Sequence, residues 1–194
     1  MTRIIAGKAG GRRLSGPRGS ATRPTSDRVR EALFSALESQ LGDLTGLRFL
    51  DLYAGTGAVG LEAWSRGAGV VAFVESDRSA VAVVRANATS IGFHKPQIHP
   101  TTALRALAMA PPAPFDLVFA DPPYGTPDEE LGRVLTALIE QQWLAPGALV
   151  VLERSSRDGA PPWPAALAQV GLKRYGETAL FTSCFQEPEA GESG

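Results

Sequence analysis

Asp121-Pro122-Pro123-Tyr124 places an acidic residue, two prolines and an aromatic ring directly after the apolar run 115–120. That run has the length and composition of a buried strand, so the four residues are expected where the strand ends. The Asp121 carboxylate can accept hydrogen bonds, the prolines lack N–H donors, and the Tyr124 ring can stack on a flat group. A pocket built this way suits an amino group carried by a nucleobase.

The chemistry expected at this pocket is methylation of that amine. An exocyclic amine is a poor nucleophile because its lone pair is delocalised into the ring. Hydrogen bonds to Asp121 and to the Pro122 carbonyl would turn the nitrogen toward tetrahedral geometry and expose the lone pair to a methyl donor. After methylation the nitrogen is acidic, so Asp121 with an ordinary pKa is expected to take its proton. Tyr124 is expected to stack on a base that has left its helix, a contact worth roughly 1–3 kcal/mol.

A glycine-containing turn at residues 50–60 joins an apolar strand to a helix. Gly55, Gly57 and a third glycine three positions later match the spacing of dinucleotide-binding turns. Glu75 ends the next apolar run, where a carboxylate would accept hydrogen bonds from ribose hydroxyls. Asp51 would repel a pyrophosphate, whereas it suits the ammonium and sulfonium groups of S-adenosylmethionine. The predicted cofactor is therefore S-adenosylmethionine.

Other functions fit parts of this pattern. A nicotinamide-dependent oxidoreductase could use the same glycine turn. A non-catalytic RNA-binding or assembly factor could keep the fold and its basic residues. A DNA amino-methyltransferase acting on adenine N6 or cytosine N4 could use the same acidic pocket, because residues 121–124 identify neither the polymer nor the base.

The elements around these motifs alternate between apolar strands and helices, which predicts a parallel sheet with helices on both faces. The last two strand-like runs, 171–175 and 177–185, are expected to pair as an antiparallel hairpin at the sheet edge. If 115–120 is the fourth strand, both motifs face one cavity at the carboxyl ends of the strands. The expected strands before the hairpin are 47–53, 70–75, 97–101, 115–120 and 148–153; the expected helices are a first one capped by Thr25 or Ser26 and running to about Gln40, then 58–66, 77–91 and 128–142.

Charge is distributed unevenly along the 194 residues, whose formal net charge is only -1. The first thirty residues carry eight basic side chains against Asp27 alone, which predicts a basic arm for phosphate contacts. Residues 1–24 are expected to form a hairpin and arm that are mobile before substrate binding, residues 25–186 a catalytic domain, and residues 187–194 a disordered tail. The expected RNA contacts are Arg3, Lys8, Arg12, Arg13, Arg23, Arg28 and Arg30.

The single cysteine, Cys184, excludes an intrachain disulfide, and no Cys/His group has the spacing of a metal site. No apolar run has the length of a signal peptide core or a membrane span. We expect a cytoplasmic, monomeric protein without a metal or a membrane partner.

The chain resembles the RsmD-type methyltransferases over about residues 3–185. The most specific shared motifs are in the basic start, at 3–7, 11–14, 23–25 and 27–31; the glycine turn, Glu75 and residues 121–124 occur in many amino-methylating enzymes. The resemblance implies methylation of the exocyclic N2 amine of a guanine in 16S rRNA, within an assembled or assembling small ribosomal subunit.

The same resemblance implies a class I S-adenosylmethionine-dependent methyltransferase fold. This α/β, Rossmann-like fold has a mostly parallel seven-stranded sheet with an antiparallel C-terminal hairpin. The implied catalytic residues are Asp121, Pro122, Pro123 and Tyr124; the implied cofactor contacts are Asp51, Tyr53, Ala54, Gly55, Thr56, Gly57, Glu75, Ser76, Thr102, Ala103 and Asp121.

Overall fold

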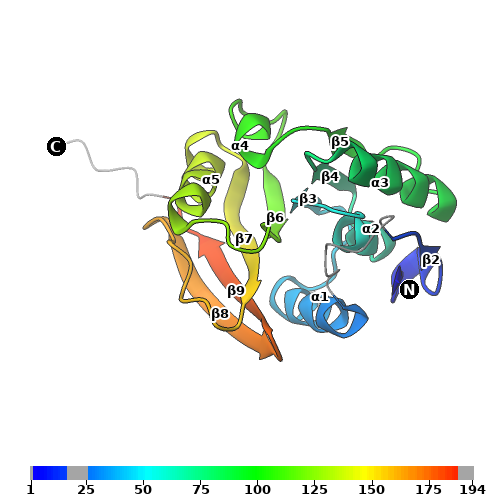
Figure 1. Cartoon of the computed structure of the whole chain (residues 1–194), viewed down its shortest axis with the longest axis horizontal. Helices are drawn as coiled ribbons and strands as arrows, with labels where there is room; N and C mark the ends of the chain where they lie inside the picture. The colour runs from blue at the N-terminus through cyan, green and yellow to red at the C-terminus, as the bar shows by residue number, and fades with distance from the viewer. Residues whose placement is uncertain (1, 17–25, 188–194) are drawn as a thin grey trace.

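The computed structural model describes residues 2–16 and 26–187 and has a seven-stranded sheet at its centre (Figure 1). The strand order is β5-β4-β3-β6-β7-β9-β8; the first five strands are parallel, and β9 runs antiparallel between β7 and β8. This arrangement confirms the predicted fold. The strands are β3 (Arg48–Leu52), β4 (Val70–Val74), β5 (Gln97–His99), β6 (Phe115–Ala120), β7 (Leu144–Ser155), β8 (Leu167–Tyr175) and β9 (Thr178–Phe185).

Helices cover both faces of the sheet, because alternate residues of each strand enter two separate apolar cores. In β6, Leu117 and Phe119 pack into one core, whereas Val118 packs into the other. The first core is closed by α1, α2 and α3, and the second by α4 and α5. The helices are α1 (Asp27–Leu41), α2 (Ala58–Ser65), α3 (Arg78–Ile91), α4 (Ala103–Ala106) and α5 (Asp128–Glu140).

Strand order reverses at β3, and this reversal positions the site. The chain passes from β3 outward to β4 and β5, then returns so that β6 pairs with the other side of β3. The register pairs Asp51 with Phe119 and Leu52 with Ala120. The loops that follow β3, β4 and β6 therefore meet at the edge where ligands bind in open α/β sheets.

Helix starts agree closely with the capping residues in the sequence. The Ser26 hydroxyl accepts a hydrogen bond from the Val29 N–H at 3.3 Å, so Ser26 caps α1. The Asp77 carboxylate accepts from the Ala80 N–H at 2.8 Å and caps α3. The four-residue α4 is an element that the sequence pattern did not predict, since it is too short to show helical periodicity.

Residues 2–16, the N-terminal segment, pack against the sheet domain. They contain β1 (Thr2–Arg3), the 3-10 turn η1 (Gly7–Ala9) and β2 (Arg13–Leu14), with β1 and β2 antiparallel. Ile4 is fully buried, and the Glu62 carboxylate on α2 accepts hydrogen bonds from the N–H groups of Ile5 and Ala6 at 2.7 and 3.0 Å. Residues 2–16 contain the predicted hairpin and pack on the domain, and their mobility before substrate binding stays a prediction. Residues 17–25 and 188–194 lie outside the described structure.

No helix in the described ranges is long and apolar enough to cross a membrane.

Candidate functional site

The turn after β3, residues 53–57, contains residues predicted to contact the cofactor and is called the cofactor loop below. Three of its residues have left-handed backbone conformations. Tyr53, Gly55 and Gly57 have φ angles of 60, 54 and 77°. Glycine adopts this region freely, whereas tyrosine does so at a cost that marks functional turns. The Gly55 N–H donates to Glu75 Oε2 at 2.8 Å, and the Ala54 N–H donates to the Val74 carbonyl at 3.0 Å. These bonds fix the loop over the ends of β3 and β4.

Asp51, at the end of β3, lies beneath this loop and is only 1% exposed. Its Oδ2 accepts the Gly60 N–H at 2.8 Å, which ties β3 to the first turn of α2. Burial raises the pKa of Asp51 well above its usual value; the Gly60 bond opposes this, and the charges of Asp121 and Glu75 add to it. An uncompensated acidic group in such a place favours a cation beside it.

Glu75 follows β4, and both of its carboxylate oxygens accept hydrogen bonds from backbone N–H groups. Oε2 holds Gly55, and Oε1 accepts the Asp77 N–H at 2.8 Å. A carboxylate has about four lone-pair sites, so Glu75 retains capacity for ribose hydroxyls. Ser76 beside it is exposed, and on the neighbouring β5 side exposed Thr102 and buried Ala103 begin α4. The sequence-predicted cofactor residues therefore gather along the ends of β3, β4 and β5.

The Asp121 loop, residues 121–124, leaves β6 next to the cofactor loop. Its far end is fixed because both the N–H and the hydroxyl of Thr126 donate to the Pro123 carbonyl, at 3.0 and 2.7 Å. Asp128 at the start of α5 then pairs with Arg154 of β7 at 2.8 Å. Asp121 is thus carried on a turn anchored to strands on both sides.

The pKa of Asp121 differs from the sequence expectation. Desolvation and the nearby charge of Glu153 raise it to about 8, so the expected ordinary pKa is wrong. Glu153 lies near the end of β7, which is parallel to β6, and sequence reasoning missed it. Like Asp121, Glu153 lies near the carboxyl end of an apolar strand, and this position in the sequence could have identified it as a site residue.

Together these carboxylates make an acidic site that fits S-adenosylmethionine. The charges of Asp121 and Glu75 add to the burial that raises the pKa of Asp51, and the pKa of Asp121 is raised as well. A ligand with a sulfonium and an ammonium group relieves this repulsion, whereas a pyrophosphate increases it. The glycine turn leaves room above it: a Cβ added at Gly55 would meet nothing within 4 Å.

The two tyrosines of the site differ in their surroundings. Tyr124 is 96% exposed, so its ring is accessible for stacking on an incoming base. Tyr53 packs against the core on the α5 side, and its buried hydroxyl has no hydrogen-bond partner among the described residues. Burial, with a smaller contribution from the charge of Glu130, raises the pKa of Tyr53 to about 12.

The predicted RNA-binding residues separate into two groups. Arg13 and Arg28 are exposed, as are Arg3, Lys8 and Arg12, although Arg3 lies 3.8 Å from Asp27, Lys8 lies over the Trp64 ring, and Arg12 donates to the Ser90 carbonyl. Arg30 is fully buried, so the prediction that it contacts RNA is wrong. Its guanidinium donates to the Arg3 carbonyl at 2.6 Å and to Asp27 at 3.0 Å, so it holds the N-terminal segment and cannot reach a phosphate. Arg23 lies outside the described residues.

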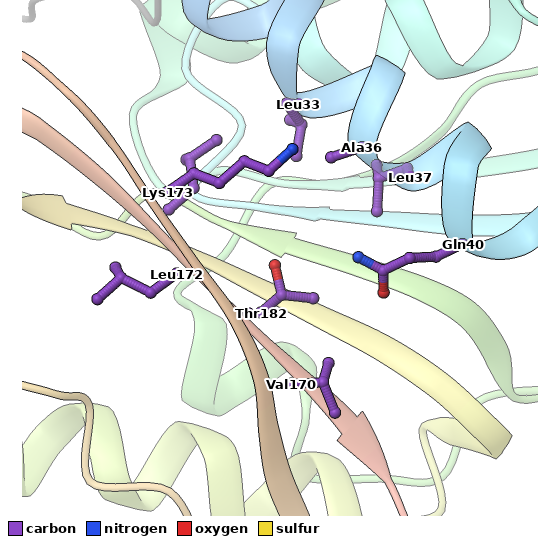
Figure 2. A pocket seen from close by; sticks show the side chains of 10 residues that line it. Leu33, Ala36, Leu37, Gln40, Val170, Leu172, Lys173 and Thr182 are labelled. Atoms are coloured by element: carbon purple, nitrogen blue, oxygen red, sulfur yellow. The ribbon is translucent and has the colours of Figure 1, made fainter.

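A separate apolar pocket of about 200 Å³ lies between α1 and the β8–β9 hairpin (Figure 2). Leu33 and Leu37 of α1 face Val170 and Lys173 of β8 across it. The described residues that line this pocket include none of the predicted cofactor or catalytic residues. It is therefore distinct from the edge where the loops after β3, β4 and β6 meet.

Comparison with known proteins agrees with the geometry. The family model described as Conserved hypothetical protein 95 matches residues 2–183. The chain is 34% identical over 191 residues to Ribosomal RNA small subunit methyltransferase D of Escherichia coli (strain K12), covering 98% of this chain and 92% of that protein.

Solved structures show the same architecture. The Escherichia coli structure named "Putative methyltransferase yhhF" has a TM-score of 0.84 and 30% identity and covers 96% of this chain and 99% of that one. The magnesium protoporphyrin IX methyltransferase ChlM of Synechocystis PCC 6803, solved with bound SAM, shares the fold at a TM-score of 0.64 and 14% identity, with 82% and 79% covered. The chain belongs to the Conserved hypothetical protein 95 family, the RsmD family of methyltransferases, and has the fold of S-adenosylmethionine-dependent methyltransferases.

Proposed function

We propose that this protein methylates the exocyclic N2 amine of a guanine in the 16S rRNA of the small ribosomal subunit, with S-adenosylmethionine as donor. The observation that carries the proposal is the position of Asp121, which follows β6 directly beside the cofactor loop that follows β3. The name of the Escherichia coli relative supports ribosomal RNA as the polymer. The choice of guanine N2 rests on the motifs shared with the family.

Asp121 and the Pro122 carbonyl are proposed to bind the amine hydrogens, and Tyr124 to stack on the base. The cofactor, when bound, supplies a methyl group on a cationic sulfur. Asp51 and Glu75 would hold it, the first through charge and the second through the ribose. As the nitrogen–carbon bond forms and the sulfur–carbon bond breaks, positive charge moves to the guanine nitrogen.

Asp121 then accepts one proton from that nitrogen, which restores the neutral amine. Only its ionised form can do so, and its pKa of about 8 means that the carboxyl is mostly protonated at neutral pH in the free protein. A cation held beside Asp121 lowers this pKa and produces the base when the methyl donor is present. A carboxylate with a raised pKa is also the stronger base once ionised.

Exposed basic side chains near the N-terminus are proposed to contact phosphates. Arg3, Lys8, Arg12, Arg13 and Arg28 remain candidates, since contacts to phosphates need accessible guanidinium or ammonium groups. Arg23 stays a prediction. The monomeric state, the cytoplasmic location and an assembled or assembling subunit as substrate likewise stay predictions.

The test is transfer of labelled methyl groups to purified small subunits, naked 16S rRNA and DNA, followed by nucleoside mass spectrometry. The expected product is N2-methylguanosine in ribosomal RNA, and Asp121→Ala should abolish it while the protein still binds the cofactor. Label in DNA adenine or cytosine would replace this proposal with the DNA alternative. RNA binding without methylation would instead support an assembly factor.

A further inference from the structure

Asn87, a buried residue of α3, joins the cofactor loop to the N-terminal segment. It is only 1% exposed, and its amide makes three hydrogen bonds to backbone groups. Nδ2 donates to the Thr56 carbonyl and to the Ser15 carbonyl, both at 3.1 Å, and Oδ1 accepts the Ser15 N–H at 2.8 Å. One side chain therefore binds two segments that are far apart in the sequence.

The chemistry of these contacts requires a carboxamide. Two carbonyl acceptors need an NH₂ group, and the Ser15 N–H needs an oxygen on the same planar head. Aspartate has the same shape but would place an oxygen against the carbonyls of Thr56 and Ser15. An aliphatic side chain would leave all three backbone groups without this partner in a partly buried place, at a cost in stability.

The N-terminal segment is also attached to the helix that follows the cofactor loop. Glu62 and Ser65 of α2 accept hydrogen bonds from the N–H groups of Ile5, Ala6 and Ala9. Because α2 begins directly after Gly57, the loop and the segment share two supports: α2 through Glu62 and Ser65, and α3 through Asn87. After Ser15 the chain continues into residues that carry Arg18 and Arg23 in the sequence.

We infer that Asn87 is a positioning residue that couples cofactor binding at the loop to the order of the N-terminal segment. The consequence for RNA rests on the proposed function, but the coupling itself does not. A ligand that restrains Thr56 makes the Asn87 bond to its carbonyl more persistent, and the same amide head then restrains Ser15. The N-terminal segment is thereby held more firmly when the methyl donor is present. Because this segment carries basic side chains proposed to contact RNA, cofactor and RNA favour each other's binding.

Hydrogen–deuterium exchange of the full chain with and without S-adenosylhomocysteine tests this coupling. In the wild-type protein, saturating ligand should slow exchange in peptides covering 53–60 and also in peptides covering 9–16, the latter by about fivefold or more. In Asn87→Asp, the loop should still be protected while the effect on 9–16 should fall below about twofold. Thr89→Ala, an exposed position on the same helix whose hydroxyl donates to the Arg85 carbonyl, is the matched control and should behave as wild type.

Ser15→Pro removes the N–H that donates to Asn87 while leaving the Thr56 bond in place. The Asn87 Nδ2 bond to the carbonyl of residue 15 can remain. The variant should therefore reduce ligand-induced protection of 9–14 and keep protection of the loop, which a general loss of stability would not produce. If ligand slows exchange in the wild-type loop but leaves exchange in residues 9–16 unchanged, the inference is overturned. This outcome does not depend on whether the variants fold. Failure of the proposed function would show separately, as absent methylation of rRNA with the exchange coupling intact.

Discussion

Replacing Asp121 with Asn should abolish methyl transfer and at the same time stabilise the folded protein. Asn keeps the shape of the side chain but cannot accept the proton from the methylated amine. It also removes a carboxyl whose ionisation is opposed in the fold by desolvation and by the charge of Glu153. When a catalytic group destabilises the folded protein, its replacement is expected to lower activity and to raise the free energy of unfolding.

The size of the effect follows from the raised pKa. The folded-state pKa of about 8 exceeds the ordinary value of 3.8, so the folded protein binds the Asp121 proton more tightly than the unfolded chain does. Stability from this group is therefore complete below about pH 4 and is lost as pH rises toward 8, by at most about 1.4 kcal/mol per pH unit. Since the Asp121 side chain is partly exposed, we expect roughly half of this, or about 1–2 kcal/mol between pH 5 and pH 7.

Urea and thermal unfolding of both proteins from about pH 5 to pH 8 measure this difference. The advantage of Asp121→Asn should grow with pH, and at pH 7 its midpoint temperature should exceed that of wild type by about 3–6 °C. Glu129→Gln, which neutralises an exposed acid in the first turn of α5, is the control and should show no such growth. Parallel stability curves for wild type and Asp121→Asn would refute the reasoning, because Asp121 would then not occupy a desolvated acidic site.

Three further results are expected. S-adenosylmethionine binding should release protons near pH 7, because a cation beside Asp121 lowers a pKa that is about 8 in the free protein. Calorimetry in buffers of different ionisation enthalpy measures this proton release. Equal release by Asp121→Asn would contradict the prediction. Gly7→Ala should destabilise the protein by roughly 2–5 kcal/mol in urea unfolding, because the new Cβ would lie 1.9 Å from the Ser65 carbonyl oxygen at a φ of 78°. Gly11→Ala, with φ of 80° and nothing within 4 Å, isolates the backbone cost of about 1 kcal/mol, so equal losses would remove the steric argument. Arg28→Ala should weaken rRNA binding and reduce its salt slope by about one, whereas the buried Arg30→Met should leave the slope unchanged; the reverse result in salt titrations would exclude this division.

The strand and helix pattern was predictable because local and tertiary preferences agree along most of the chain. The run 115–120 matches β6 at both ends, and Ser26 and Asp77 begin helices as their capping chemistry requires. The expectation that the loops after β3 and β6 face one cavity depended on strand order, and the pairing of β6 with β3 meets that condition. The strand ends and helix caps, by contrast, are properties that a few neighbouring residues determine.

Two errors came from properties that depend on distant neighbours. Arg30 has the same sequence signature as Arg28, yet one lies inside and the other outside, because α1 turns one of them toward the Arg3 carbonyl. The pKa of Asp121 depends on its desolvation in the folded protein and on the charge of Glu153, a residue of another strand that approaches through the β6–β7 pairing. Charge counted along a chain does not distinguish a buried group from a solvated one.

The buried position of Arg30 also changes how the basic start of the chain is understood. A segment that only carried charge to a phosphate would need no buried guanidinium, and no carboxylate or amide in the core to receive its backbone. Glu62 and Arg30 each bind the backbone of residues 2–16, and so does Asn87. Because Asn87 also binds the carbonyl of Thr56, the N-terminal segment is connected to the proposed site of the methyl donor, which is the arrangement expected if donor and RNA bind in a mutually dependent way.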